Sequence, residues 1–124
     1  MTSIDLTDAY FHIPVHKSSR RFLRFVWNRT VFQFRALCFG ITTAPCIFTR
    51  VFHPLSVWAH KHGIRLTRYL DDWLITSATK EQAEQDMKTI LQLCDRLGLL
   101  GNLSKSDLSL SRRIAYLGMI VVSS

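Results

Sequence analysis

Two adjacent carboxylates, Asp71 and Asp72, lie between two segments rich in apolar and β-branched residues. This pattern predicts a strand, a tight turn that carries the acids, and a returning strand. The turn lacks the glycine or asparagine that a two-residue hairpin favours, so we expect strain in its backbone. Like charges on a strained turn favour a bound cation, although a solvated Asp-Asp turn is also common.

A third carboxylate, Asp5, falls near the start of the chain on the predicted strand Ile4-Asp5-Leu6. Alternation along a strand points Ile4 and Leu6 to one face and Asp5 to the other. An acid in that place is either a plain surface residue or a ligand presented at the edge of a sheet.

The chain has 124 residues, of which 48% are hydrophobic and 20% charged, as expected of one globular domain. Its formal net charge of +7 favours a polyanionic partner, most simply nucleic acid. A basic surface that only maintains solubility is the alternative.

Three cysteines without paired spacing indicate reduced thiols, mostly in the core. We find no signal-peptide pattern at the N-terminus and no run near the roughly 20 apolar residues of a membrane span. These features predict an intracellular protein of the cytoplasm or nucleus, without a membrane partner.

Residues 22–37 predict a β-hairpin with arms 22–27 and 31–37 and a loop at 28–30. Both faces of its first arm carry apolar groups, so we expect the hairpin to pack on each side. Its arginines and phenylalanines interleave in a way that suits a nucleic-acid backbone and stacked bases, with solvated arginines and core aromatics as the alternative. The residues concerned are Arg24, Phe25, Arg29, Phe32, Phe34 and Arg35.

Two amphipathic helices complete the pattern. The first is expected to start at Thr43 as N-cap, to kink or break at Pro54 and to end before Gly63. The second starts with a capping box at Thr79 and ends at Gly98. A last strand or hairpin lies within residues 112–122. The order of elements predicts an α+β fold with two helices against one antiparallel sheet.

Four segments together resemble the motifs of reverse transcriptases. Ile4–Phe11 resembles the first catalytic motif, Leu37–Pro45 the second, and Tyr69-Leu70-Asp71-Asp72 the third. Residues 98–105 and 116–118 resemble the lysine-bearing motif and the primer-gripping hairpin. The Phe39-Gly40 pair and the residues after Asp72 look most like retrotransposons of the gypsy-like or tyrosine-recombinase-encoding kinds.

The resemblance covers nearly the whole chain and implies a polymerase palm, an antiparallel sheet with helices packed on one face, plus a β-hairpin from the fingers. Residues 1–124 would form a partial reverse transcriptase domain, with the N-terminal fingers, the thumb and ribonuclease H absent from it. One departure is Cys38, which stands where relatives usually have proline, and we expect it to affect loop rigidity more than chemistry.

By resemblance, the chain is part of an RNA-directed DNA polymerase that transfers a nucleotide from a deoxynucleoside triphosphate to a primer 3′-hydroxyl. Two Mg²⁺ ions, or Mn²⁺, would bind Asp5, the Leu6 carbonyl, Asp71 and Asp72, while Lys105 would act as general acid. The predicted partners are an RNA or DNA template with its primer, and deoxynucleoside triphosphates. The nucleotide would contact Asp8, Ala9, Tyr10, Phe39 and Gly40, and the primer Tyr69, Leu117 and Gly118.

Two other functions are open at this point. The chain could be a catalytically inactive relic or a domesticated module that binds nucleic acid through its basic surface. A metal-dependent nuclease could use the same acids, but Tyr10 and the Tyr69 motif argue against it.

Overall fold

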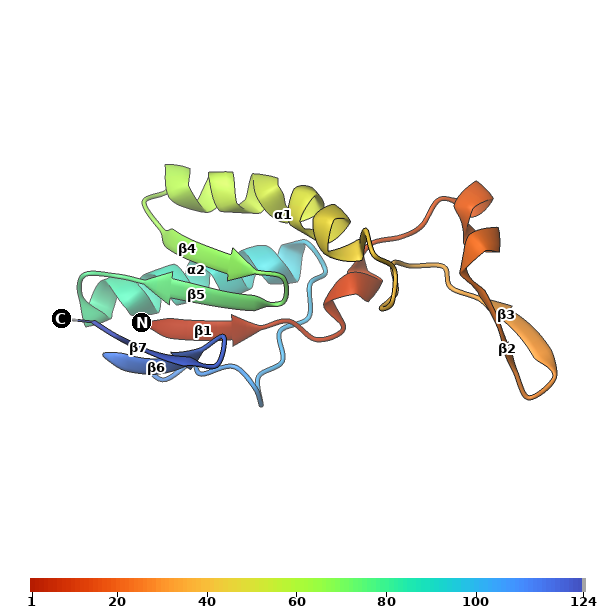
Figure 1. Cartoon of the computed structure of the whole chain (residues 1–124). Helices are drawn as coiled ribbons and strands as arrows, with labels where there is room; N and C mark the ends of the chain where they lie inside the picture. The colour runs from red at the N-terminus through yellow and green to blue at the C-terminus, as the bar shows by residue number, and fades with distance from the viewer. Residues whose placement is uncertain (124) are drawn as a thin grey trace.

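A three-stranded antiparallel sheet forms the centre of the computed structural model, which describes residues 1–123 (Figure 1). Strand β5 lies in the middle and pairs with β1 on one side and β4 on the other. The strands span Thr2–Asp5 (β1), Arg65–Tyr69 (β4) and Asp72–Thr76 (β5).

Both long helices cover one face of this sheet. Helix α1 spans Ala44–Lys61 and helix α2 spans Lys80–Arg96. Side chains of one sheet face form a continuous apolar core with both helices, because alternation points them to the same side. The central members of this core are Ile4, Leu66, Trp73, Ile75, Phe48, Phe52, Ile90 and Cys94. The predicted α+β fold, with helices packed on one face of an antiparallel sheet, is confirmed.

A separate hairpin covers the other face of the sheet. Strands β6 (Arg113–Tyr116) and β7 (Met119–Val122) pair only with each other, and Ile114 and Tyr116 pack on Leu74 of β5. The prediction of one sheet was therefore wrong.

The outer edge of β1 explains this separation. The Asn102 amide donates to the Asp5 carbonyl at 2.7 Å, and the Ser3 amide donates to the Asp107 carbonyl at 3.0 Å. Because the loop at residues 102–107 already satisfies this edge, the last hairpin lies against the face of the sheet instead of extending it.

Helix α1 has Thr43 at its N-cap position and ends before Gly63, as predicted, but it differs in detail at two residues. Thr43 precedes the helix but its side chain makes no capping hydrogen bond, since its backbone is already helical (φ −86°, ψ −9°). Pro54 lies inside a continuous helix, so the possible break was wrong. Phe52 and Leu55, buried on either side of it, hold the helix on the core despite the missing amide.

Helix α2 begins and ends as predicted. The Thr79 hydroxyl accepts from the Gln82 amide at 3.1 Å, and Gly98 follows the helix with φ +72°. The Gln82 side chain does not complete the capping box, because it donates to the buried Asp86 carboxylate at 2.7 Å. Asp86 also accepts from the Ser77 hydroxyl, so this acid fixes the connection between β5 and α2.

A β-hairpin projects from the body of the molecule, after two 3₁₀ helices, η1 (Ala9–His12) and η2 (Lys17–Leu23) (Figure 1). Its strands are shorter than predicted: β2 spans Arg24–Trp27 and β3 spans Thr30–Gln33. Asn28 and Arg29 alone form the turn, both with positive φ.

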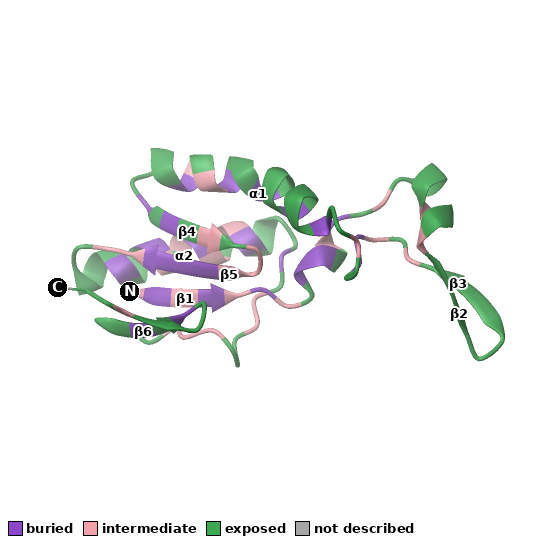
Figure 2. Cartoon of the chain, in the orientation of Figure 1, coloured by how far each residue is buried: buried purple, intermediate pink, exposed green. Residues whose placement is uncertain are grey.

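Within residues 1–123 both strands of this hairpin are exposed, so the packing predicted on each side is not found there. All eight residues of its strands are exposed (Figure 2), and Trp27 has 72% of its surface open. Within the described chain the hairpin is held near its base, where the Val15 amide donates to the Arg35 carbonyl at 2.8 Å. Aromatic rings continue this contact toward the core: the Phe25 ring lies 5.1 Å from Phe34, and Phe34 stacks on Phe11 at 6.2 Å between ring centroids.

The cysteines follow their prediction: Cys38 and Cys94 are buried and Cys46 is exposed, and all three are free thiols. Burial raises the pKa of the Cys94 thiol to about 11. None of the helices within residues 1–123 has the length and apolarity needed to cross a membrane.

Replacing Ile90 by alanine tests the core under α2. Ile90 is fully buried, so Ile90→Ala is expected to lower the free energy of unfolding by about 2–5 kcal/mol in urea titrations. The matched control is Leu97→Ala at the end of the same helix, where the side chain is 54% exposed; it should change stability by less than about 1 kcal/mol. Equal losses of unfolding free energy in Ile90→Ala and Leu97→Ala would contradict the burial of Ile90.

Thiol labelling tests the cysteine environments. At pH 8 a soluble disulfide reagent should label the native chain rapidly at one thiol, Cys46, because Cys94 is both buried and protonated and Cys38 is buried. Cys46→Ser should remove the fast phase, and denaturant should expose all remaining thiols. A second fast thiol in the native protein would contradict the structure.

Candidate nucleotidyl-transfer site

Asp5 and Asp72 lie directly opposite each other on β1 and β5. The Asp5 amide donates to the Ser106 hydroxyl at 3.0 Å, and the Asp5 carbonyl accepts from Asn102, so neither group reaches β5. This is a non-hydrogen-bonded pair, the class in which opposite Cα atoms are about 4.5 Å apart and the side chains are closest. The register therefore brings the two carboxylates together on the sheet face away from the helices.

Asp71 lies in the two-residue turn before β5. Leu70, the other turn residue, has φ +51°, which confirms the predicted backbone strain. Two hydrogen bonds hold this turn: the Leu6 amide donates to the Asp71 carbonyl at 3.0 Å, and the Trp73 indole donates to the Leu70 carbonyl at 2.8 Å. The acid-bearing turn is thus fixed to both the first strand and the core.

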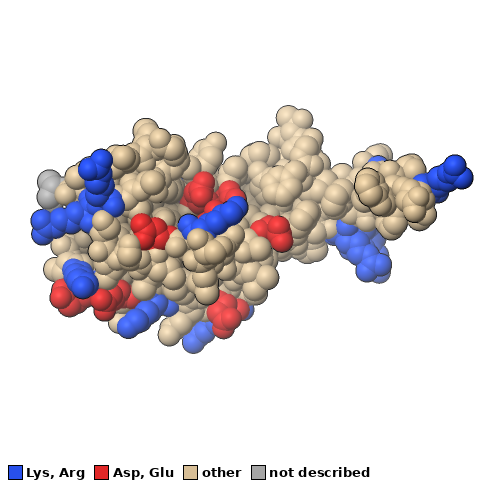
Figure 3. All heavy atoms as spheres, turned by 90° about the horizontal axis from the view of Figure 1, so that it is seen from below, with Lys and Arg blue, Asp and Glu red and all other residues tan. Residues whose placement is uncertain are grey.

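A small hollow of about 90 Å³ joins several predicted site residues. Asp5, Asp72 and Lys105 line it, together with Leu117 of the β6–β7 turn. Acidic and basic side chains lie together near the middle of this side of the molecule (Figure 3). Four residues from separate parts of the sequence therefore meet at one place.

The charges at this site act on one another. Burial raises the pKa of Asp5 and the Asp71 charge raises it further, whereas Lys105 lowers it. Burial also raises the pKa of Asp72, and the charges of Asp71 and Asp5 raise it further, whereas the Lys105 charge lowers it. A site that destabilises its own carboxylate charges gains stability from a bound cation.

The donor set is of the kind that Mg²⁺ prefers, because carboxylates and a main-chain carbonyl are hard oxygen ligands. No hydrogen bond to the Leu6 carbonyl is found within residues 1–123. In the same range, no three His, Cys, Asp or Glu side chains converge closely enough to hold one ion together. The oxygen ligands of Asp5 and Asp72 are of the chemical type that binds a divalent cation. Asp71 lies beside this pair on the turn.

Two predicted nucleotide residues, Tyr10 and Phe39, lie in contact with ring centroids 5.0 Å apart. Tyr10 is buried and also packs edge-on against Phe48, whereas Phe39 is 67% exposed. Burial raises the pKa of Tyr10, and the nearby charges of Asp71 and Tyr69 raise it further. The Tyr10 ring therefore lies within electrostatic reach of the acid-bearing turn.

The other predicted nucleotide residues lie in turns. Asp8 has φ +49° and precedes η1, whose Ala9 amide is at the unpaired N-terminal end. Gly40 has φ +88°, and a Cβ there would meet nothing within 4 Å. Within this chain, glycine is needed at this position for its backbone conformation and not for close packing.

Two of the predicted primer residues, Tyr69 and Leu117, line different hollows. Leu117 and Gly118 form the two-residue β6–β7 turn, with φ +51° and +73°. Tyr69 is 59% exposed and opens onto a larger hollow of about 470 Å³ between β4 and α1, lined with Pro45, Cys46, Thr49, Arg50, Arg68 and Leu70. Tyr69 remains tied to the acids because it pairs with Asp72 across the hairpin.

The family model described as "Reverse transcriptase (RNA-dependent DNA polymerase)" matches residues 1–121. The chain belongs to the reverse transcriptase family.

Curated relatives of this reverse transcriptase chain include polyproteins of viruses and of a transposon. It is 29% identical over 117 residues to the Transposon Tf2-3 polyprotein of Schizosaccharomyces pombe and 28% identical over 122 residues to the Gag-Pol polyprotein of Walleye dermal sarcoma virus. These matches cover 94% and 97% of the chain but 9% and 7% of the relatives. The chain thus spans less than a tenth of these polyproteins.

Solved structures of a foamy viral protease-reverse transcriptase share the fold. The complex with an RNA/DNA hybrid matches 98% of this chain and 16% of its own, with a TM-score of 0.86 and 21% identity. A complex with double-stranded DNA matches 99% of this chain and 26% of its own, with a TM-score of 0.87 and 22% identity.

Three residues around the carboxylates, and Arg68 on the helix side of the sheet, were not singled out from the sequence as site residues. Ser106 and Asn102 hold the main chain of Asp5, and the Tyr116 hydroxyl donates to the Asp72 carbonyl at 3.1 Å. Arg68 donates to the Ser56 hydroxyl and lies over the Trp73 ring, and burial lowers the pKa of its guanidinium. Asn102 and Tyr116 had a sequence signal, since they lie in or beside the segments 98–105 and 116–118. Ser106 and Arg68 act through tertiary contacts.

Asp72→Asn tests the repulsion between the carboxylates. Because the native pKa of Asp72 lies above its unfolded value of 3.8, the folded protein binds more protons, and stability falls as pH rises through the raised pKa. In chelator, Asp72→Asn should therefore be more stable than the parent at pH 7, with a difference that shrinks below pH 3.8. Thermal unfolding across this range measures it.

The control is Glu84→Gln, which removes an exposed acid from α2 and should show no comparable gain. A loss of stability in Asp72→Asn at pH 7 would mean that favourable partners, not repulsion, dominate around this carboxylate.

Proposed function

We propose that this chain is the palm of a retroelement RNA-directed DNA polymerase, of the gypsy-like or tyrosine-recombinase-encoding kind, with a hairpin from the fingers. The observation that carries the proposal is the facing pair of Asp5 and Asp72, with Lys105 and the Leu117 turn at the same hollow. Residues 1–124 are a partial domain, and fingers, thumb and ribonuclease H belong elsewhere in a longer protein.

Asp5, Asp71 and Asp72 would hold two Mg²⁺ ions, or Mn²⁺, with the Leu6 carbonyl as a further ligand. When bound, such ions stabilise charge on the attacking and leaving oxygens of an in-line displacement. The chain's part is to fix these oxygen ligands before substrate arrives, through the β1–β5 register and the hydrogen bond from Leu6 to the acid-bearing turn.

Lys105 is proposed to donate a proton to the leaving pyrophosphate. It lines the same hollow as Asp5 and Asp72, and its amide is held by the Asn102 carbonyl at 3.2 Å. The loop that carries Lys105 is the one that grips Asp5, so the proton donor and the first carboxylate are positioned by the same contacts.

The incoming deoxynucleotide is proposed to lie against Tyr10, Phe39 and Gly40, with its triphosphate near the amides of Asp8 and Ala9. Tyr10 is held between Phe39 and Phe48, so its ring is rigid enough to crowd a 2′-hydroxyl and to favour deoxynucleotides. The exposed Phe39 ring offers a surface for the nucleotide.

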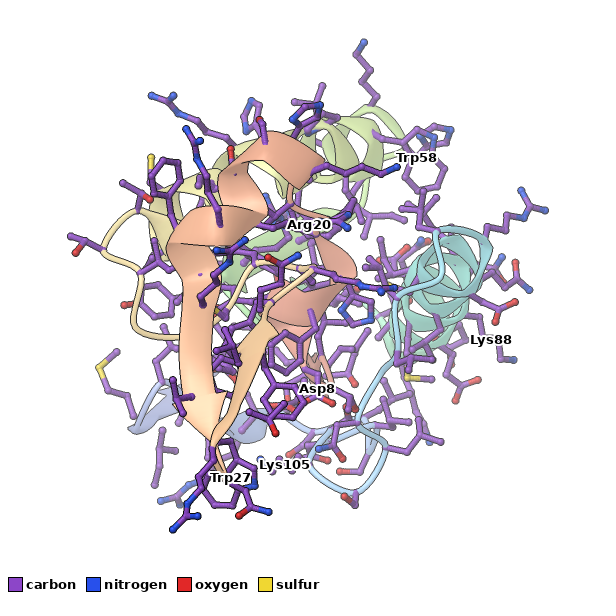
Figure 4. The ribbon with its side chains drawn as sticks, turned by 90° about the vertical axis from the view of Figure 1, so that its right-hand side faces the viewer. Asp8, Arg20, Trp27, Trp58, Lys88 and Lys105 are labelled. Atoms are coloured by element: carbon purple, nitrogen blue, oxygen red, sulfur yellow. The ribbon has the colours of Figure 1, made fainter. Side chains whose placement is uncertain are left out.

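The template and primer are proposed to lie along the basic part of the chain. Residues 9–70 contain ten Lys or Arg residues and no Asp or Glu, so the positive charge is concentrated in η2, the hairpin, α1 and β4. Trp27 at the hairpin tip lies on the same side of the molecule as Lys105, with Trp58 on the other side (Figure 4). The foamy viral complexes, with an RNA/DNA hybrid or double-stranded DNA, support this partner.

Primer extension on an RNA template by the complete protein that contains this chain tests the function. Asp71→Asn should lower the extension rate by about 100-fold or more, because it removes one carboxylate from the charge-stabilising set. The control is Glu84→Gln, which removes an exposed acid from α2, and it should extend the primer at the rate of the parent.

Equal extension by Asp71→Asn and the parent would show that the acids are wrongly assigned. No extension by the parent, with nucleic-acid binding retained, would identify the chain as an inactive relic or a basic binding module.

A further inference from the structure

The side chain of Tyr116 joins the last hairpin to the acid-bearing strand. Its hydroxyl donates to the main-chain carbonyl of Asp72 at 3.1 Å, although the residues are 44 positions apart. Tyr116 is 8% exposed and lines the hollow that contains Asp5, Asp72 and Lys105. The contact therefore lies beside the carboxylates and directly before the Leu117 turn.

This hydrogen bond has a mechanical role because β6 and β7 are not part of the central sheet. Two hydrogen bonds between Ser111 and Met1, at 2.9 and 3.2 Å, hold the base of the hairpin. Nearer its turn, the hairpin rests on the sheet through apolar contacts of Ile114 and Tyr116 with Leu74. Apolar contacts are non-directional and allow a hairpin to slide, whereas a hydrogen bond fixes distance and angle.

We propose that Tyr116 is a positioning residue whose hydroxyl fixes the Leu117-Gly118 turn relative to the Asp72 carboxylate, and thereby the primer end relative to the catalytic acids. This inference rests on the proposed function. It assigns to Tyr116 a role in the rate of nucleotide transfer beyond its packing on the sheet.

The surroundings of Tyr116 keep its hydroxyl a donor. Burial raises the pKa of Tyr116, and the charge of Asp72 raises it further. Phenylalanine at this position would preserve the ring packing on Leu74 and Ile114 and remove only the donor to Asp72. The Tyr116→Phe substitution therefore separates the two roles of the side chain.

Single-turnover primer extension by the complete protein tests this role, since the amplitude reports the active fraction and the rate constant reports positioning. Tyr116→Phe should lower the rate constant about 3- to 10-fold, as expected for one lost hydrogen bond, with the amplitude unchanged. The control Ile114→Val weakens packing on the same strand; it should lower the melting temperature and leave the rate constant unchanged.

In the 124-residue chain, the carbonyl carbon resonance of Asp72 should shift in Tyr116→Phe and not in Ile114→Val; an unchanged resonance would overturn the contact. If the parent extends the primer and Tyr116→Phe has the same rate constant, or differs only by a lower amplitude, the positioning role alone is overturned. A parent that fails to extend overturns the proposed function and this role together.

Discussion

The register between β1 and β5 is the constraint on which the rest of the site depends. It sets Asp5 opposite Asp72 in a non-hydrogen-bonded pair, the class in which opposite side chains are closest. Two like charges therefore lie at close range. A shift of one residue would turn Asp5 into the core and Ile4 out of it. Burial of Ile4 and Leu6 under the helices fixes the register, and so the stability of the core holds the repelling carboxylates together.

Separate parts of the chain then complete this pair. The loop at residues 102–107 occupies the free edge of β1, grips the main chain of Asp5 and brings in Lys105. With that edge occupied, the β6–β7 hairpin lies on the sheet face, where Leu117 reaches the same hollow. One set of edge hydrogen bonds therefore decides the positions of both the lysine and the last turn.

The projecting hairpin differs from the other strands within residues 1–123 because both of its strands are exposed throughout. It has strong local signals, with alternating strands and a two-residue turn, and these form as expected. The prediction of packing on both faces is not met within residues 1–123, because apolar composition shows that a surface can be buried but does not say which segment covers it. The helix break that Pro54 could cause is absent for a different reason, since packing of α1 on the sheet overrides local helix signals.

The sequence by itself determined the local structure: the alternation that buries Ile4 and turns Asp5 to the other face, the strained turn at Leu70-Asp71, and the helix cap at Thr79. It also determined the order of motifs that indicates a reverse transcriptase. Tertiary structure decided which residues meet. The meeting of Leu117 with Asp5 and Asp72 at one hollow depends on how distant segments pack, and so do the contacts of Ser106 and Tyr116 with the acid-bearing strands. Short-range periodicity is set by neighbouring residues, whereas contacts across 44 or 101 positions depend on edges and faces that exist only in the folded sheet.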